Sequence, residues 1–277
     1  MRVKHTKQYT VSVLMAVYKN DHPEWLRLAI DSVLKQTLPA DEIIVVVDGA
    51  VPLILKQVIE SYGQQIRVLW LKKNQGLWNA LNQGLKIAQG ELIARMDADD
   101  IAMLNRLEKQ VRAFEKNPKL DIVGAQIAEF ENNVDNIIAY RRVPLDQKSI
   151  TRFARFRSPF NHPTVMYKKA SILNVGGYRH LRRTEDYDLW VRMLQSGAQC
   201  INISDVLLKY RVSSANICRR TNRVNYREMN QLYYRSYRTG FINLFEYLFI
   251  RLARWWFYYT PGFMKYGLYK KVLRHEQ

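Results

Sequence analysis

The stretch GELIARMDADD, residues 90–100, is the part of the chain that decides the fold. Glu91–Met96 is a short, mostly apolar segment that we interpret as a buried strand, and three carboxylates, Asp97, Asp99 and Asp100, follow at its carboxyl end. Carboxylates at such a position are costly to bury without a cation. Hard oxygen ligands favour Mg²⁺ or Mn²⁺, and alternating aspartates can place one side chain on a ribose and the next on the ion. The motif therefore predicts a strand that ends in a metal site.

A helix is expected soon after these aspartates, because apolar residues recur at helical spacing from Leu104 to Phe114. This helix allows a second interpretation of the motif, in which Asp99 or Asp100 only caps its first turn. The position of the aspartates at the end of a strand favours the metal site.

Upstream of this stretch, strand and helix patterns alternate. Continuous apolar runs predict buried strands, and apolar residues at helical spacing predict helices between them. The predicted strands are Val11–Val17, Ile43–Val47 and Ile66–Leu71, and the predicted helices are Trp25–Leu34 with Pro23 in the first turn, Leu53–Tyr62 and Leu77–Ala88. This alternation predicts an α/β fold with a parallel, doubly wound sheet, which binds ligands at the carboxyl ends of its strands.

Polar residues also follow the first two predicted strands. Tyr18-Lys19-Asn20 comes after the first strand, and Asp48-Gly49 comes after the second. The carboxylate of Asp48 can accept a hydrogen bond from a nucleotide base or a ribose, although an aspartate beside a glycine is also common in ordinary turns. Polar clusters at three strand ends are the first indication of a ligand site.

The second half of the chain is less regular. We expect strands at Asp121–Phe130, Asn136–Arg142, Ile201–Ile203 and Leu207–Val212, and a helix at Asp186–Leu194. A boundary near residues 213–220 divides the sequence into a domain at residues 1–213 and a basic, aromatic tail at residues 214–277.

The acidic segment Thr184–Trp190 opens the predicted helix. A carboxylate in the first turn of a helix is stabilised by the helix dipole, which alone explains many such residues. One of them can also take the proton from an attacking hydroxyl. Together with the aspartates that follow Met96, the general-base interpretation is the better one.

Two further residues each have a functional interpretation and an ordinary structural one. His162 is a lone histidine, and such residues are more often structural than catalytic. Arg211 ends a predicted strand and can pair with a phosphate, although a solvated arginine is an equally good interpretation.

The overall composition points to an anionic partner. The formal net charge is +18, and residues 219–277 alone hold 12 Lys and Arg against 3 Asp and Glu, with 16 of the 33 aromatic residues. Basic, aromatic segments bind membrane surfaces or nucleic acid. The two cysteines, Cys200 and Cys218, lack a metal-ligand spacing and fit a reducing compartment. Val11–Tyr18 is too short to span a bilayer, so we expect a cytoplasmic protein.

The tail contains a predicted helix at Phe241–Tyr259. Its main polar residues, Asn243, Glu246, Arg251 and Arg254, fall on one face and leave a wide apolar face. An interfacial helix with Trp255 and Trp256 at the level of the lipid headgroups fits this pattern. The alternative is an ordinary helix that packs on the catalytic domain.

Taken together, the chain resembles the family 2 glycosyltransferases with a GT-A fold, especially bacterial surface-polysaccharide enzymes of the amylovoran-biosynthesis type. The match runs in order over residues 10–212, so it is far more specific than any one motif. The segments that carry it are VSVLMAVYKN, SVLKQT, EIIVVVDG, NQGLWNALNQGLKIAQGELIARMDADD, NHPTVMY, VGGYR and EDYDLWVRML. Val47 stands where relatives have a first aspartate, which leaves Asp48 alone at that strand end.

The resemblance implies roles for individual residues. It implies that Asp186, with Glu185 beside it, is the catalytic base and that Asp99 binds a divalent metal, Mn²⁺ or Mg²⁺. The residues implied in nucleotide-sugar binding are Ala16, Tyr18, Asp48, Asn74, Gly76, Asp97 and Arg211, and those implied near the acceptor are His162 and Trp190.

The resemblance also implies the reaction. It implies an inverting hexosyltransferase that moves a sugar, with galactose as one candidate, from a nucleotide-sugar such as a UDP-sugar to a lipid-linked oligosaccharide or lipopolysaccharide acceptor in O-antigen or other polysaccharide biosynthesis. Such an enzyme is expected at the cytoplasmic face of the inner membrane, with the tail as its peripheral membrane contact.

Two other functions remain open at this point. One is a nucleotidyltransferase-like enzyme, which needs a glycine-rich phosphate loop that AVYKNDHPE, residues 16–24, lacks. The other is a non-catalytic, basic module for membrane or nucleic acid, although no nucleic-acid motif is present and we expect no nucleic-acid partner.

Overall fold

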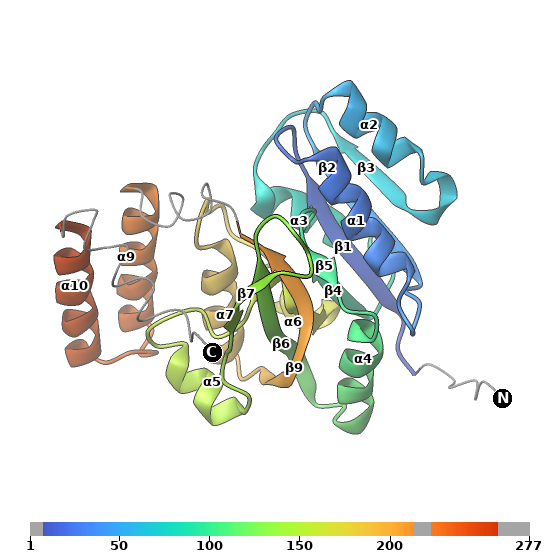
Figure 1. The fold of residues 1–277 in the computed structure, drawn as a ribbon. Helices are drawn as coiled ribbons and strands as arrows, with labels where there is room; N and C mark the ends of the chain where they lie inside the picture. The colour runs from blue at the N-terminus through green and yellow to red at the C-terminus, as the bar shows by residue number, and fades with distance from the viewer. Residues whose placement is uncertain (1–7, 213–222, 260–277) are drawn as a thin grey trace.

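A computed structural model describes residues 8–212 and 223–259 of the chain, the side chains of 257–259 excepted, as a twisted sheet with helices on both faces (Figure 1). Strand β1 (Val11–Val17) lies in the middle of the parallel part of the sheet. It pairs in parallel with β2 (Glu42–Asp48) on one side and with β4 (Leu92–Met96) on the other, and β3 (Arg67–Leu71) extends the sheet beyond β2. The four parallel strands predicted from apolar runs are confirmed.

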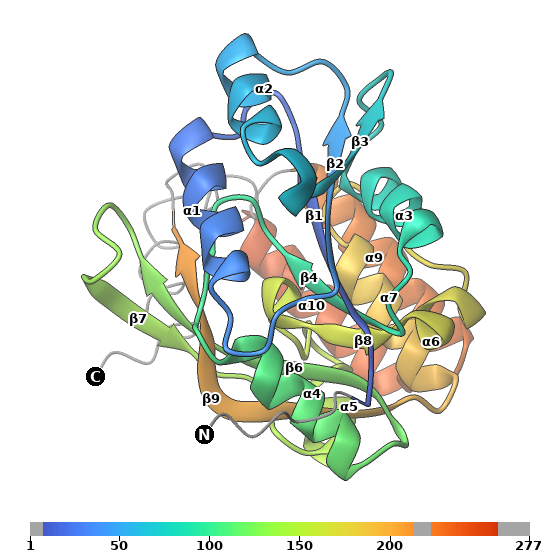
Figure 2. The same cartoon turned by 90° about the vertical axis from the view of Figure 1, so that its right-hand side faces the viewer.

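Alternate side chains of these strands point to opposite faces, and both faces are apolar. On β1, Val13 and Met15 belong to one core cluster and Leu14 to another. Helices on the first face are α1 (Pro23–Leu34), α2 (Leu53–Glu60) and α4 (Arg106–Lys116), and those on the second are α3 (Leu77–Ile87) and α7 (Glu185–Gln195). Figure 2 shows α1 and α3 on opposite sides of β1 and β2.

Beyond β4, outside the region for which the alternation predicted parallel strands, the sheet is mixed. The order is β3-β2-β1-β4-β8-β6-β9-β5, and β7 pairs with β6. Strand β8 (Met166–Lys168) is antiparallel to both β4 and β6 (Leu120–Phe130). The remaining strands are β5 (Ile101–Ala102), β7 (Ile137–Arg141) and β9 (Gln199–Arg211). The three-residue strand β8 is too short to leave a periodic signal in the sequence.

The two short strands expected at 201–203 and 207–212 are one strand, β9. It runs parallel to β6, and its register shifts where Ala125 pairs with Ile203 and Gln126 pairs with Val206. This irregularity absorbs the polar pair Ser204-Asp205, so the strand continues where the sequence pattern is interrupted.

Several short elements had no prediction. They are α5 (Gln147–Phe153), α6 (Lys169–Asn174) and the 3-10 turns η1 (Gly63–Gln65) and η2 (His162–Thr164). Asp146 caps the start of α5, and its carboxylate accepts a hydrogen bond from the Ser149 amide at 3.0 Å. Such a cap is a local signal that helix periodicity does not detect.

Two helices follow the sheet domain, α9 (Arg223–Arg238) and α10 (Leu244–Tyr259). Figure 1 shows α10 at the outer edge, with α9 between it and α7. Within the described ranges, none of the helices combines the length and the apolar character that crossing a bilayer requires. The predicted domain boundary near 213–220 lies outside the described residues and stays a prediction.

The strand order places the candidate site. The chain order reverses between β1 and β4, and the crevice at such a switch point is where open α/β sheets bind ligands. Tyr18, Asp48 and Asp97 each stand at or just beyond the carboxyl end of one of the three strands around this point, β1, β2 and β4.

Candidate active site

The aspartates after β4 form a compact group. One carboxylate oxygen from each of Asp97, Asp99 and Asp100 lies within 4.8 Å of the others. Burial first, and then the negative charge of Asp97, raises the pKa of Asp99 to about 6. Asp100 is fully buried, and its Oδ2 has no hydrogen-bond partner among the described residues. Three clustered hard oxygen donors, together with an unpartnered buried oxygen on Asp100, fit a divalent cation.

The alternative role of these aspartates, as caps of the next helix, is excluded. Helix α4 begins at Arg106, and Asn105 is its N-cap residue. The short strand β5, which pairs with β9, stands between the aspartates and the helix. Asp99 and Asp100 are therefore too far from the helix end to cap it.

Two arginines that sequence reasoning missed lie behind the aspartates. Arg95 is 2% exposed, and its guanidinium forms an ion pair with Asp97. Burial lowers the pKa of Arg95, but the charge of Asp97 and the hydrogen bond to it outweigh burial and raise the pKa above its usual value. Arg106 donates to the Arg95 carbonyl at 2.6 Å, and burial and the Arg95 charge lower its pKa to about 9. The available signal was a charged residue inside an otherwise apolar strand, two positions before Asp97.

Arg211, predicted from its place at the end of a strand, does reach the aspartates. Its backbone amide donates to the Asp100 carboxylate at 2.9 Å, and its Nε donates to the Asp99 carbonyl at 3.1 Å. The Cζ atom of the guanidinium lies 4.5 Å from the centroid of the Trp25 ring and 4.6 Å from that of the Phe130 ring. Arg211 therefore fixes the turn that presents the aspartates, and its role towards a phosphate stays a prediction.

Asp48, Asn74 and Gly76 are brought together as one hydrogen-bonded group. The two carboxylate oxygens of Asp48 accept from the amides of Gln75 and Gly76 at 2.9 and 2.8 Å, and the Asn74 side chain donates to the Asp48 carbonyl. Gly49 has φ +88°, and a Cβ there would meet the Asn74 nitrogen at 2.6 Å, so only glycine allows this close approach. Asp48 thus organises the loop, while its contact with a base stays a prediction.

The end of β1 supplies the other predicted nucleotide contacts. Ala16 and Tyr18 are half-buried, and the Tyr18 amide donates to the Asp21 carboxylate at 2.8 Å. This hydrogen bond fixes the turn after β1. Both residues stay predictions for nucleotide binding.

Glu185 and Asp186 open α7 and differ in environment. Glu185 is buried and Asp186 is half-buried. Burial first, and then the charge of Asp186, raises the pKa of Glu185 to about 8. The Arg95 charge opposes this rise, and the same charge also lowers the pKa of Asp99. The charge of one buried guanidinium therefore favours the ionised form in both carboxylate groups.

The two residues predicted near an acceptor have different outcomes. His162 accepts from or donates to the Tyr178 hydroxyl at 3.0 Å, and burial and the Arg95 charge hold its pKa well below the usual value, so the ring is neutral. Trp190 is 0% exposed and packs edge-on against His162 in the core. We correct its assignment accordingly, because a fully buried indole supports His162 but cannot contact an acceptor.

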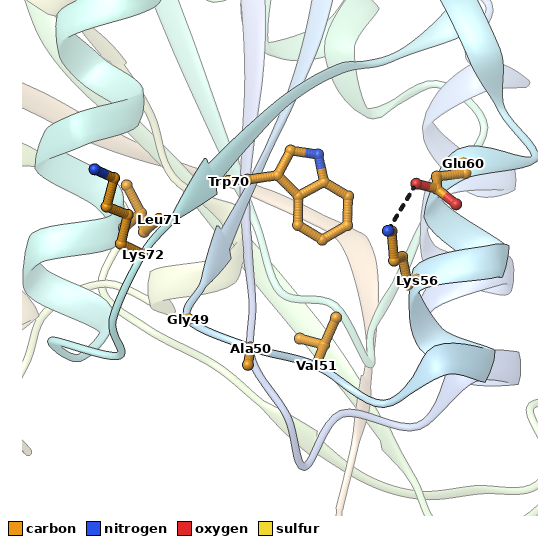
Figure 3. Close-up of a pocket in the computed structure, with 8 residues that line it drawn as sticks. All are labelled: Gly49, Ala50, Val51, Lys56, Glu60, Trp70, Leu71 and Lys72. Atoms are coloured by element: carbon orange, nitrogen blue, oxygen red, sulfur yellow. Dashed lines mark ion pairs between the residues drawn. The ribbon is translucent and has the colours of Figure 1, made fainter.

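A separate pocket of about 450 Å³ lies beside the site, between the end of β2, strand β3 and helix α2 (Figure 3). Its lining residues are Gly49, Ala50, Val51, Lys56, Glu60, Trp70, Leu71 and Lys72. Lys56 pairs with Glu60 at 3.6 Å and lies 6.0 Å from the Trp70 ring centroid. The predicted site residues do not line this pocket, so we assign it no part in the reaction.

The raised pKa of Glu185 predicts a pH-dependent stability. The folded chain holds this proton up to about pH 8, whereas an unfolded glutamate loses it near pH 4.5, so the stability contributed by Glu185 falls as pH rises through this window. We expect Glu185→Gln, which cannot titrate, to gain in Tm relative to the wild type between pH 5 and pH 8.5. Thermal unfolding of both proteins across this range tests it, and a constant difference in Tm would contradict it.

The chain matches known proteins over most of its length. The profile of Glycosyl transferase family 2 matches residues 12–181. An uncharacterised glycosyltransferase of Haemophilus influenzae is 38% identical, over 95% of this chain and 98% of the relative. The amylovoran biosynthesis glycosyltransferase AmsE of Erwinia amylovora is 37% identical, over 87% and 91%. The UDP-Gal:alpha-D-GlcNAc-diphosphoundecaprenol beta-1,3-galactosyltransferase of Escherichia coli is 37% identical, over 95% and 96%.

Solved structures support the fold. The mannosyltransferase PcManGT of Pyrobaculum calidifontis, solved with GDP-Man and Mn²⁺, superposes with a TM-score of 0.63 at 17% identity, covering 96% of this chain and 80% of that one. Residues 1–349 of S. aureus TarS superpose with a TM-score of 0.63 at 19% identity, covering 80% of this chain and 64% of that one. These likenesses bear on the fold alone, and they confirm the GT-A architecture.

Proposed function

The chain belongs to glycosyl transferase family 2 and is a glycosyltransferase, and from this premise we propose that it is an inverting, metal-dependent hexosyltransferase. One observation carries the proposal. Three carboxylates cluster within 4.8 Å of one another just after β4, and a second carboxylate group, Glu185 and Asp186, opens α7. One group suits a metal and a sugar diphosphate, and the other suits the acceptor hydroxyl.

The two alternatives from the sequence are not favoured. Family membership supports sugar transfer rather than a nucleotidyltransferase-like reaction or a non-catalytic binding module. The buried, clustered carboxylates are also costly to maintain in a module that only binds an anion.

Asp99 is the proposed metal ligand, with Asp97 beside it on the ribose side of the nucleotide. A bound Mn²⁺ or Mg²⁺ would act as a Lewis acid and offset the charge of the leaving diphosphate. The chain's own contribution is to hold the ligands in place: Arg95 orients Asp97, and Arg211 fixes the Asp99-Asp100 turn through two hydrogen bonds. The carboxylates are then positioned before the donor arrives.

Asp186 is the proposed base. It takes the proton from the acceptor hydroxyl as that oxygen bonds to the anomeric carbon, while the bond from this carbon to the diphosphate oxygen breaks on the opposite face. A single displacement of this kind inverts the anomeric configuration. Burial raises the pKa of Glu185 to about 8, so Glu185 holds its proton at neutral pH and is not the available base there.

The donor is proposed to be a UDP-sugar, held by Ala16, Tyr18, Asp48, Asn74, Gly76 and Arg211. The acceptor is proposed to be a lipid-linked saccharide or a lipopolysaccharide core on the side of His162. Support comes from the Escherichia coli relative, whose name gives UDP-Gal as donor and a GlcNAc-diphosphoundecaprenol as acceptor. Galactose is therefore the first donor sugar to test.

The defining experiment uses the full chain with Mn²⁺, a GlcNAc-diphosphate-lipid acceptor and a panel of UDP- and GDP-sugars. We expect transfer from one UDP-sugar, with a β-linked product from the α-configured donor. The linkage is read by NMR of the product. Transfer from none of the donors, or a product that retains the α configuration, would contradict the proposal.

A lipid-linked acceptor requires an enzyme that works at the membrane surface, and we propose that α10 makes this contact at the cytoplasmic face of the inner membrane. Its apolar side chains recur every three to four residues on one exposed face. These side chains are Leu244, Phe245, Leu248, Phe249, Leu252, Trp255 and Trp256. Phe245 is 83% exposed and Leu252 is 68% exposed, which is unusual for such large apolar side chains in one patch.

The polar side of α10 faces the protein instead. Glu246 forms an ion pair with Arg155 at 2.8 Å, and the Arg254 guanidinium lies 5.5 Å from the Tyr226 ring and 5.8 Å from the Tyr233 ring. The helix therefore packs on the protein through Glu246, Arg254 and the buried Ile250, which leaves the exposed apolar face to a lipid surface. The net charge of +9 in residues 219–277 favours an anionic bilayer.

The double substitution Phe245→Ser and Phe249→Ser tests this contact. Burial of one such side chain contributes about 1.5–3 kcal/mol, so we expect vesicle binding to weaken by at least about tenfold. Flotation with phosphatidylglycerol vesicles measures it, and Leu53→Ser with Ile54→Ser, two exposed residues of α2, is the matched control. Undiminished flotation of the α10 variant would contradict the proposal. A wild-type protein that is a dimer, and that the α10 substitutions convert to a monomer, would also contradict it, because the apolar face would then bind a second copy of the chain.

A further inference from the structure

Helix α9 contacts the segment that leads into the proposed base. The carboxylate of Glu228 accepts hydrogen bonds from the amides of Arg182 and Arg183, at 2.9 and 2.8 Å, and lies 3.4 Å from the Thr184 hydroxyl. Glu185 and Asp186 are the next two residues. A side chain more than forty positions away in the sequence thus holds the three residues before them.

This arrangement replaces a local cap. Thr184 is the N-cap residue of α7, and its side chain makes no capping hydrogen bond. The carboxylate of Glu228 stands near the positive end of the α7 dipole, where a negative charge is favourable. Two backbone hydrogen bonds to the two oxygens of one carboxylate fix both the position and the direction of the chain at this point.

A second contact from the same face of α9 lies two helical turns later. Arg235 donates to the Asp188 carboxylate at 3.2 Å, and Asp188 is in the first turn of α7. Between these two polar contacts, Leu232 and Tyr233 are buried against α7, and the Tyr233 ring meets the Tyr187 ring edge-on at 6.1 Å. Helix α9 therefore contacts the segment before α7 and the first turn of α7 at two polar points, with buried packing between them.

We propose that Glu228 is a positioning residue for the reaction: through the backbone of residues 182–184 it holds Asp186 in the geometry needed to accept the proton. This inference rests on the proposed role of Asp186. Displacement of a reacting group by about 1 Å can cost on the order of 100-fold in rate, so a hinge next to the base is a sensitive place. Helix α9 then belongs to the catalytic unit and is not part of a detachable tail.

The Glu228 charge also has an electrostatic effect that can be measured separately. The charges that act on Glu185 come from Asp186 on its own helix, Glu228 on α9 and Arg95 on β4. Asp186 and Glu228 raise the pKa of Glu185, and Arg95 lowers it. Removal of the Glu228 charge therefore lowers the pKa of Glu185.

Glu228→Gln is the first variant to test. The amide keeps the shape of the side chain but presents an NH₂ group to one of the two backbone N–H donors, so one hydrogen bond becomes a repulsion. We expect kcat to fall by about 10- to 100-fold, with the dissociation constant of the UDP-sugar within twofold of wild type. The matched control is Glu60→Gln, the same change on the exposed surface of α2, which should leave kcat unchanged.

A double-mutant cycle tests whether Glu228 acts through Asp186. If it does, Glu228→Gln adds no further loss to the residual rate of Asp186→Asn. Equal losses in both backgrounds, or no loss in the wild-type background, would overturn the inference. Circular dichroism of each variant at the assay temperature separates these outcomes from unfolding, and Glu228→Asp, which keeps the charge, replaces Glu228→Gln if the latter does not fold.

A readout without activity separates this inference from the proposed function. In the wild type, Glu185 causes the free energy of unfolding to fall as pH rises from about its unfolded pKa to its raised folded pKa. Glu228→Gln lowers the folded pKa of Glu185, so in this background the fall should end at a lower pH. Tm differences between Glu228→Gln and Glu228→Gln/Glu185→Gln across pH 5–8.5 measure it. If this shift is seen while Asp186→Asn remains active, the contact of Glu228 with the start of α7 is supported and Asp186 is not the base. If the pH range over which Glu185 affects Tm is unchanged, the contact of Glu228 itself is contradicted.

Discussion

Asp186→Asn is expected to lower kcat by about 10²- to 10⁴-fold while the donor binds as in the wild type. The amide is nearly isosteric with the carboxylate, so the half-buried site keeps its shape but loses the group that accepts the proton of the acceptor hydroxyl. Steady-state kinetics with the lipid-linked acceptor give kcat, and calorimetry with the UDP-sugar gives the donor affinity. A loss confined to kcat is the signature of a group used only in the transition state.

The neighbouring carboxyl provides the comparison for this experiment. Glu185→Gln should retain most of the rate at neutral pH, because Glu185 already holds its proton there. Asp205→Asn, an exposed aspartate that pairs with Lys109, is the matched control for an acid-to-amide change remote from the aspartate group. Full activity of Asp186→Asn together with inactivity of Glu185→Gln would assign the base to Glu185 instead.

Asp99→Ala is expected to remove the metal dependence of donor binding. In the wild type we expect Mn²⁺ to strengthen UDP-sugar binding and EDTA to abolish transfer. The variant lacks one of three clustered oxygen donors, and its affinity for Mn²⁺ should fall by at least about 100-fold, since even outer-shell partners of a metal contribute 10- to 100-fold. Calorimetric titration of the UDP-sugar with and without Mn²⁺ measures the change.

The design of this test follows from the contacts of the turn. Arg211 binds the backbone of Asp99 rather than its side chain, so truncation of the side chain leaves that hydrogen bond in place. Asp135→Asn, an exposed aspartate in the loop before β7, serves as the control for a lost carboxylate. Mn²⁺-dependent donor binding that survives in Asp99→Ala would exclude Asp99 as a ligand.

The positions of most candidate site residues could be predicted because these residues lie at the ends of regular elements. Asp48, Asp97 and Asp186 each mark the point where a strand ends or a helix begins, and the structure has these elements within a few residues of the predicted bounds. A continuous apolar run specifies a buried strand, and the polar residue after it must then lie at the sheet edge. The local pattern that predicts a strand therefore also predicts where the polar residue after it lies.

Other residues gave no such signal. Arg95 lies within an apolar strand. Its role depends on its ion pair with Asp97 and on its charge effect on Glu185 in α7, which is distant in the sequence. Trp190 lies on a helix that was predicted, but whether its indole meets core or solvent depends on the packing of η2 and β8 against it. Helix periodicity identifies a buried face and does not identify its partner.

The C-terminal helices make the same distinction clearest. The amphipathic pattern of residues 241–259 and the basic charge of the tail follow from composition and spacing alone. Composition and spacing do not determine which way the apolar face is turned, because a helix with the same spacing can pack that face on the protein or turn it away. The contacts of Glu246 with Arg155 and of Glu228 with the backbone before α7 settle the orientation of both helices. They join residues 91 and 46 positions apart, and pairings over such separations arise only when the chain has folded.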